Sequence, residues 1–167
     1  GFGTFYPFCM EINSTIGLPG SYKFQSNSSV DSHVDPLSKG TAYLFQSFTA
    51  GSLYDRSLDA AHDLNAGLLQ AALWYLEDEV DDTWVNAASF IVGNPFIAAA
   101  VNKFGSLASA KADYTGDRVA VLNLTTSAGK KRQDVLISVP DTGATLALLG
   151  LAMVGLGLAR RRYAAAA

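Results

Sequence analysis

Hydrophobic and polar residues alternate in blocks that predict strands at both ends of the chain and helices between them. Segments rich in aromatic and β-branched residues favour strands. The four predicted strands cover residues 4–12, 21–26, 117–126 and 132–140. Gly and Pro within residues 17–20 predict a turn after the first strand, and Ser127, Ala128 and Gly129 predict another before the last. Residues 27–36 are polar and predict a loop.

Three helices are predicted between the two pairs of strands. They cover residues 39–49, 58–79 and 95–110. Ser38 is a favourable N-cap for the first helix, and Asn94 followed by Pro95 favours the start of the third. Asn65 and Gly67 favour a break within the second. This order predicts an α+β fold in which the N- and C-terminal strands share one sheet and the helices form an insert.

An uncharged run near the C-terminus predicts a membrane-spanning helix. Residues 144–159 carry no charge over 16 positions, and Arg160, Arg161 and Arg162 follow at once. As a helix the run would be roughly 24 Å long, which is short of the ~30 Å hydrocarbon core of a bilayer. Extension through Thr142 and snorkelling of the arginines closes most of that difference. A buried core helix is the alternative for a run of this length.

The arginine cluster also predicts the orientation in the membrane. Because positive residues stay on the cytoplasmic side, residues 1–140 are expected outside the inner membrane, on its periplasmic or extracellular side. Gly1 is then expected to be a processed N-terminus. The predicted organisation is an extracytoplasmic domain at 1–139, followed by a stem, a transmembrane helix and the arginine cluster at 140–163. Residues 164–167 are all alanine and carry no information.

Composition and charge argue against several classes of function. The 167 residues suffice for one domain with a hydrophobic core. A net charge of −3 without a basic stripe argues against nucleic-acid binding. His33 and His62 lie in polar sequence without ligand-type spacing, so neither a metal nor another cofactor is predicted. The sequence lacks the G-x-S-x-G pattern of serine hydrolases, and we do not expect an enzyme.

Two residues differ in character from their surroundings. Cys9 is the only cysteine, so no intrachain disulfide can form. Three interpretations remain open for it: an inert buried thiol, a reactive thiol, or an intermolecular disulfide. Gln70 is a polar amide among the apolar residues of a predicted helix. An amide buried without partners costs a few kcal/mol, so Gln70 is expected to have one.

A thiol and a glutamine amide in dry surroundings are the two components of an internal thioester. The thiolate attacks the amide carbon, ammonia leaves, and the sulfur of Cys9 becomes bonded to Cδ of Gln70. An incoming amine or hydroxyl group can later take the acyl group, which attaches the protein covalently to its target. Trp74 lies one helical turn after Gln70 and is a candidate shield against water. The acidic run at residues 77–82 is expected to be a solvated surface.

Several blocks of this sequence resemble the Cys-Gln thioester domains of bacterial surface proteins. The blocks are FCMEI, DPLSKGTAYLFQSFTAGSL, LLQAALWYLEDE, NPF and VLNL, and together they cover most of residues 5–139. That family has an aromatic residue before a cysteine near the mature N-terminus, which Cys9 matches. It also has a hydrophobic Q-x-A-[IL]-W-x-L-E helix, matched here by Gln70, Ala72, Leu73, Trp74, Leu76 and Glu77. The resemblance implies a thioester-domain-like β-sheet or sandwich with a helical insert and a Cys9–Gln70 cross-link.

The tail VPDTGATLALLGLAMVGLGLARRR resembles the VPD-type variant of the PEP-CTERM sorting signal, with Val139, Pro140, Asp141 and Gly143 as its stem. The resemblance implies export, followed by processing near the stem by an exosortase, a membrane enzyme similar to transpeptidases, and release to the cell surface. We therefore expect an exported, single-span surface protein for adhesion or matrix assembly, with a thioester for an amine- or hydroxyl-bearing target. The alternative is an accessory subunit on the outer face of a larger membrane complex.

Overall fold

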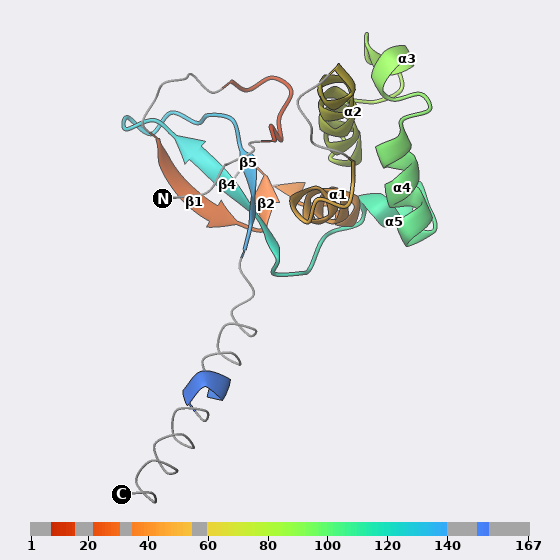
Figure 1. Ribbon diagram of the computed structural model, residues 1–167. Helices are drawn as coiled ribbons and strands as arrows, with labels where there is room; N and C mark the ends of the chain where they lie inside the picture. The colour runs from red at the N-terminus through yellow and green to blue at the C-terminus, as the bar shows by residue number, and fades with distance from the viewer. Residues whose placement is uncertain (1–7, 16–21, 31–34, 55–59, 140–149, 154–167) are drawn as a thin grey trace, which may run out of the picture.

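The computed structural model describes residues 8–15, 22–30, 35–54, 60–139 and 150–153. These residues form a sheet on one side and a group of helices on the other (Figure 1). The predicted α+β class is confirmed. Strands from both ends of the domain share one sheet, and the helices lie between them in sequence, as predicted.

Three antiparallel strands form the main sheet in the order β1-β4-β5. They are β1 (Lys23–Asn27), β4 (Val119–Thr125) and β5 (Val135–Ser138). In this register Lys23 faces Thr125, and Val119 faces Ser138. Between β4 and β5 the chain turns at Gly129, whose φ of 81° favours glycine over other residues.

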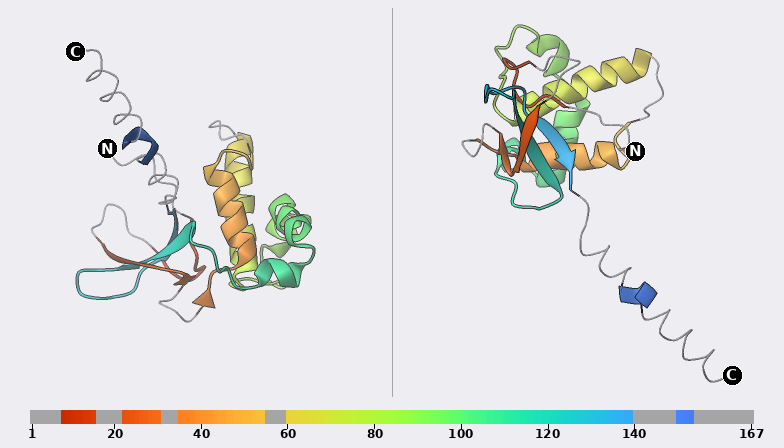
Figure 2. Two further views of the ribbon diagram at one scale, coloured as in Figure 1. Left: turned by 90° about the horizontal axis from the view of Figure 1, so that it is seen from below. Right: turned by 90° about the vertical axis from the view of Figure 1, so that its left-hand side faces the viewer.

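Helix α1 (Lys39–Thr49) packs against one face of this sheet (Figure 2). The main hydrophobic core lies between the two. Phe45 and Phe48 of α1 pack edge-on against Phe8, with ring centroids 6.1 and 4.9 Å apart. The buried members of this core from the sheet are Val119, Val121 and Leu136. Val119 and Val121 alternate along β4, and Leu136 of β5 faces Val121, so this face of the sheet lies in the core.

The remaining helices of the domain pack against α1 and against one another (Figure 2). They are α2 (Ala60–Leu76), α3 (Ala87–Phe90), α4 (Pro95–Phe104) and α5 (Leu107–Lys111). Leu69, Leu73 and Leu76 of α2 are buried in the main core. A second, smaller cluster joins α2 to α3, and its buried members are Ala71, Val80, Ala87 and Ile91.

Two helices begin at the predicted caps. The side chain of Ser38 accepts a hydrogen bond from the N–H of Thr41 at the start of α1. Asn94 caps α4, with Pro95 in the first turn. The break expected near residues 65–67 is wrong, because α2 is continuous through them.

Other elements differ from the predicted pattern. The single helix predicted at 95–110 is divided, because Gly105 ends α4 with a φ of 83° and Ser106 then caps α5. Within the segment predicted as a loop, β2 (Ser29–Val30) pairs with β3 (Asp35–Pro36). These two-residue strands are too short to leave a periodic pattern in the sequence.

Asn94 connects α4 to two neighbouring segments. Its Oδ1 accepts hydrogen bonds from the N–H groups of Phe96 at 2.8 Å and Ile97 at 3.3 Å. Its Nδ2 donates to the carbonyl oxygens of Leu68 at 2.8 Å and Phe90 at 2.6 Å. The residue is only 3% exposed, so water cannot replace these partners.

We expect Asn94→Ala to lower the free energy of unfolding by about 2–3 kcal/mol, because the cap and both buried carbonyl contacts are lost. Asn94→Asp keeps the cap oxygen but sets a carboxylate oxygen against the two buried carbonyl oxygens, so it is expected to cost at least as much as Asn94→Ala. Urea denaturation measures both changes. An Asn94→Ala variant as stable as the unaltered protein would contradict this assignment.

The predicted transmembrane segment lies largely outside the described residues. Its described part, residues 150–153, is helical and exposed. Within the ranges that the structure describes, no helix is both long enough and apolar enough to cross a bilayer. The transmembrane helix therefore stays a prediction.

Candidate functional site at Cys9 and Gln70

Cys9 lies at the edge of the main sheet, next to β5. It faces Val135 in an antiparallel bridge, and the N–H of Met10 donates to the carbonyl oxygen of Asp134 at 3.0 Å. In this kind of pair, the residue between two hydrogen bonds turns its own N–H and C=O away from the partner strand. The backbone groups of Cys9 therefore point outward from the sheet.

The side chain of Gln70, on α2, meets both of these groups. The N–H of Cys9 donates to Oε1 of Gln70 at 3.0 Å, and Nε2 of Gln70 donates to the carbonyl oxygen of Cys9 at 2.6 Å. One side-chain amide thus makes the hydrogen bonds that a further strand would make. Gln70 has the partner expected of a polar residue in an apolar helix, and that partner is 61 positions away in sequence.

Two carboxylates hold the residues that follow Cys9. The N–H of Ile12 donates to Oε2 of Glu79 at 3.1 Å, just beyond the end of α2. Oε2 of Glu11 accepts a hydrogen bond from the N–H of Asp134 at 3.2 Å. Burial raises the pKa of Glu11 above its ordinary value. The Cys9 segment is therefore fixed to the sheet on one side and to the α2 region on the other.

Glu77 makes a further link from the end of α2. Its Oε1 accepts a hydrogen bond from the N–H of Ser38 at 3.1 Å, at the N-terminus of α1. The residue is 6% exposed, and its Oε2 makes no hydrogen bond within the described residues. Burial raises the pKa of Glu77, although the polar groups of Thr41 and Ser38 offset part of this shift.

The solvated surface expected at residues 77–82 is wrong for two members of the run. Glu77 is buried and Glu79 is half-buried, because both accept hydrogen bonds from the backbone of other segments. The three aspartates of the run are exposed, as expected. Among them Asp78 forms an ion pair with Lys111.

The thiol of Cys9 is half-buried, and burial raises its pKa above the ordinary value. The thiol is therefore protonated at neutral pH. Trp74, the candidate shield, packs on the second hydrophobic cluster with its ring edge-on to Trp84, at a centroid distance of 6.1 Å. Its role as a shield for the Cys9–Gln70 pair stays a prediction.

Val139 is the part of the predicted sorting stem that the structure describes. Its N–H donates to the carbonyl oxygen of Arg118 at 2.9 Å, which continues the pairing of β4 and β5 beyond Ser138. The other predicted tail residues lie outside the described residues: Pro140, Asp141, Gly143, Arg160, Arg161 and Arg162.

His62 is half-buried, and its ring packs near that of Tyr54. Its Nδ1 lies 3.5 Å from Oδ1 of Asp63. His33 lies outside the described residues. In the part of the chain that the structure describes, no group of three or more His, Cys, Asp or Glu side chains is placed to hold a metal ion.

The sequence predicts that Glu77 and Glu79 lie on the surface. In the structure both accept hydrogen bonds from the backbone of other segments. A signal for Glu77 is present, because it follows α2 directly, its N–H still donates to the carbonyl oxygen of Leu73 at 3.0 Å, and it lies two helical turns after Gln70. Glu79 lies beyond Leu76, where α2 has ended, so helical periodicity holds no information about its direction.

Comparison with known families identifies the tail. Residues 138–163 match the model of the VPDSG-CTERM motif. No curated protein and no solved structure matches the chain significantly. The match supports the predicted PEP-CTERM-like sorting tail, and it begins at Ser138, inside β5. The chain therefore carries a sorting tail of the kind that indicates an exported protein.

Proposed function

We propose that this protein is an exported surface protein whose domain forms an internal thioester between Cys9 and Gln70. The thioester attaches the protein once, covalently, to an amine- or hydroxyl-bearing target in adhesion or matrix assembly. The observation that carries this proposal is the pair of hydrogen bonds between the backbone of Cys9 and the amide of Gln70. They hold a glutamine amide beside the only cysteine of the chain.

Formation of the thioester balances with these two residues alone. The sulfur of Cys9 attacks Cδ of Gln70, so that an S–C bond forms and the C–N bond to Nε2 breaks. The thiol proton passes to the departing nitrogen, which leaves as ammonia, and neither an oxidant nor a reductant is needed. Because the raised pKa leaves little thiolate, the rate depends on holding the two groups in position.

The two hydrogen bonds suit this step. Negative charge develops on Oε1 as the sulfur attacks, and the N–H of Cys9 already donates to that atom at 3.0 Å. The carbonyl oxygen of Cys9 accepts from Nε2, the nitrogen that leaves, at 2.6 Å. The backbone of Cys9 thus orients the amide for attack by its own side chain.

Such a bond persists only where water is kept away from it, since water hydrolyses thioesters. Phe8 and Met10 are buried in the main core, and because successive side chains of an extended segment point to opposite faces, they anchor the segment without covering the Cys9 thiol. Trp74 would provide the protection as a shield. Cys9 and Gln70 are themselves half-buried, which leaves a route for an incoming amine or hydroxyl group.

The sorting tail supplies the cellular setting of the proposal. Residues 144–159 would span the inner membrane and keep the domain on its outer side. An exosortase-type enzyme would then process the tail near the stem and release the domain to the cell surface.

Intact mass spectrometry of the full chain tests the thioester. Loss of ammonia makes the cross-linked chain about 17 Da lighter than its sequence, and methylamine then adds about 31 Da. Cys9→Ala and Gln70→Glu are the matched controls, and both are expected at their sequence masses with no response to methylamine. A native mass equal to the sequence mass, unchanged by methylamine, would overturn the proposal.

A further inference from the structure

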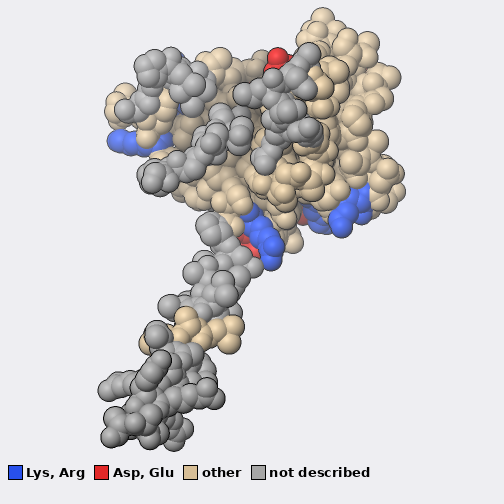
Figure 3. Space-filling view, viewed as in Figure 1, with Lys and Arg blue, Asp and Glu red and all other residues tan. Residues whose placement is uncertain are grey.

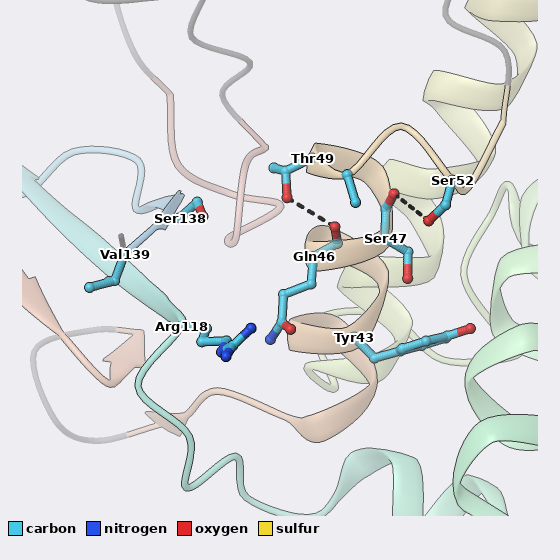
Figure 4. A pocket seen from close by; sticks show the side chains of 9 residues that line it. Tyr43, Gln46, Ser47, Thr49, Ser52, Arg118, Ser138 and Val139 are labelled. Atoms are coloured by element: carbon cyan, nitrogen blue, oxygen red, sulfur yellow. Dashed lines mark hydrogen bonds between the residues drawn. The ribbon is translucent and has the colours of Figure 1, made fainter. Parts of the chain in front are cut away.

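A hollow of about 630 Å³ opens where the chain leaves the domain for the sorting tail. It lies between α1 and the ends of β4 and β5, as Figure 4 shows. The α1 wall includes Tyr43, Gln46, Ser47 and Thr49, and the sheet wall consists of Arg118, Ser138 and Val139. We call this feature the stem hollow.

The stem hollow is lined by both apolar and polar groups, and Arg118 is the one charged residue among its lining residues. Arg118 and Gln46 extend toward one another from the sheet and from α1 (Figure 4). Tyr114 supports both, because its hydroxyl oxygen accepts from Nε2 of Gln46 and from the backbone N–H of Arg118, each at 3.3 Å. A guanidinium among amide and hydroxyl groups suits a carboxylate of a partner.

Two residues belong both to the stem hollow and to the sorting motif, which begins at residue 138. Ser138 pairs with Val119 in the sheet, and the N–H of Val139 donates to the carbonyl oxygen of Arg118 at 2.9 Å. The domain therefore holds the first two residues of the motif. An enzyme that reads the start of the motif meets it as part of the sheet.

The length of the stem brings a processing enzyme to the same place. Only residues 140–143 separate Val139 from the apolar run that begins at residue 144. Four residues span at most about 14 Å when fully extended. A folded domain of 100 residues already has a radius of gyration of about 13 Å. An enzyme acting within this stem must therefore touch the domain surface around Val139.

We propose that the stem hollow is a docking surface for the membrane enzyme that processes the tail, and that Arg118 binds a carboxylate of that enzyme. Lys and Arg side chains on this side of the domain have Asp or Glu side chains next to them (Figure 3), so a carboxylate partner is indicated by Arg118 in the stem hollow and not by a basic face. The inference rests on the processing step of the proposed function and is independent of the thioester.

Co-expression of the full chain with an exosortase-type enzyme tests the docking surface. Pulse-chase labelling follows the rate at which the tail is removed. Arg118→Glu reverses the charge at an exposed position, and Ser47→Trp fills the hollow without changing charge. Each is expected to slow processing about tenfold or more, because a docking contact is lost. Lys130→Glu, a matched charge reversal at the opposite end of the β4–β5 hairpin, is expected to leave the rate unchanged.

The possible outcomes distinguish the docking inference from the proposed tail processing and from the proposed thioester. Equal melting temperatures for the variants and the unaltered chain would show that slow processing does not arise from unfolding. Normal processing of both Arg118→Glu and Ser47→Trp would overturn the docking inference and leave tail processing in place. If the unaltered chain is not processed at all, both the processing step and the docking inference are wrong, whereas the mass test for the thioester is unaffected.

Discussion

Gln70→Leu is expected to lower the free energy of unfolding by about 5 kcal/mol. The proposed thioester joins residues 61 positions apart, and a cross-link that closes a loop of this size stabilises a protein by about 4 kcal/mol. The change also removes the acceptor for the N–H of Cys9, at a cost of about 1 kcal/mol. Urea denaturation of the full chain measures the loss.

Cys9→Ala is the comparison that separates the cross-link from the hydrogen bonds. It removes the proposed cross-link, but the Gln70 amide keeps both hydrogen bonds to the backbone of residue 9. We therefore expect a smaller loss of unfolding free energy, of about 3 kcal/mol. One of the two hydrogen bonds of the free Gln70 amide offsets part of the stabilisation that the proposed cross-link would supply. A loss below about 1 kcal/mol for Cys9→Ala, with Gln70→Leu still destabilising, would leave Gln70 as a structural partner without a thioester.

Glu77→Gln is expected to stabilise the domain at neutral and alkaline pH and to have no effect in acid. The pKa of Glu77 is raised in the folded state, chiefly by burial, above its unfolded value of about 4.3. Folding therefore favours the neutral carboxyl. That stability is fully present below the unfolded pKa and is lost as pH rises through the folded pKa. Glutamine is neutral throughout and avoids this loss.

Thermal unfolding between pH 4 and 9 measures the effect. The gain at neutral pH is expected to be about 1.4 kcal/mol for every tenfold increase in proton affinity that folding gives the carboxyl. Glu77→Leu is the control, because it leaves the N–H of Ser38 without its acceptor and should cost about 1–3 kcal/mol at every pH. A difference between Glu77→Gln and the unaltered chain that does not change with pH would contradict a pKa of Glu77 that folding raises.

Helix starts are the most predictable part of this fold. Ser38 and the Asn94-Pro95 pair act through hydrogen bonds and dihedral angles within a few residues, so their effect is visible in local sequence. The division at Gly105 depends on one residue with positive φ inside an otherwise helical pattern. Glycine is tolerated within helices, so local sequence leaves its role undecided.

The sequence predicts which segments form strands better than it predicts which strands lie side by side. Val, Ile and Leu residues mark β4 and β5 as strands, and the turn at Gly129 joins them as a hairpin. The place of Cys9 beside Val135 rests on contacts between residues more than a hundred positions apart. Hydrophobic periodicity states which face of a strand is buried, and says nothing about which strand lies beside it.

Local sequence identifies Cys9, Gln70 and the sorting tail, because a single cysteine, an amide in an apolar helix and a motif are properties of residue type and spacing. Only the tertiary structure turns the backbone of Cys9 toward Gln70, brings Glu77 to Ser38 and Glu79 to Ile12, and places Arg118 beside the stem. These contacts form because backbone groups at the sheet edge and at a helix start need partners when they leave water. Packing between distant segments decides which side chains supply them.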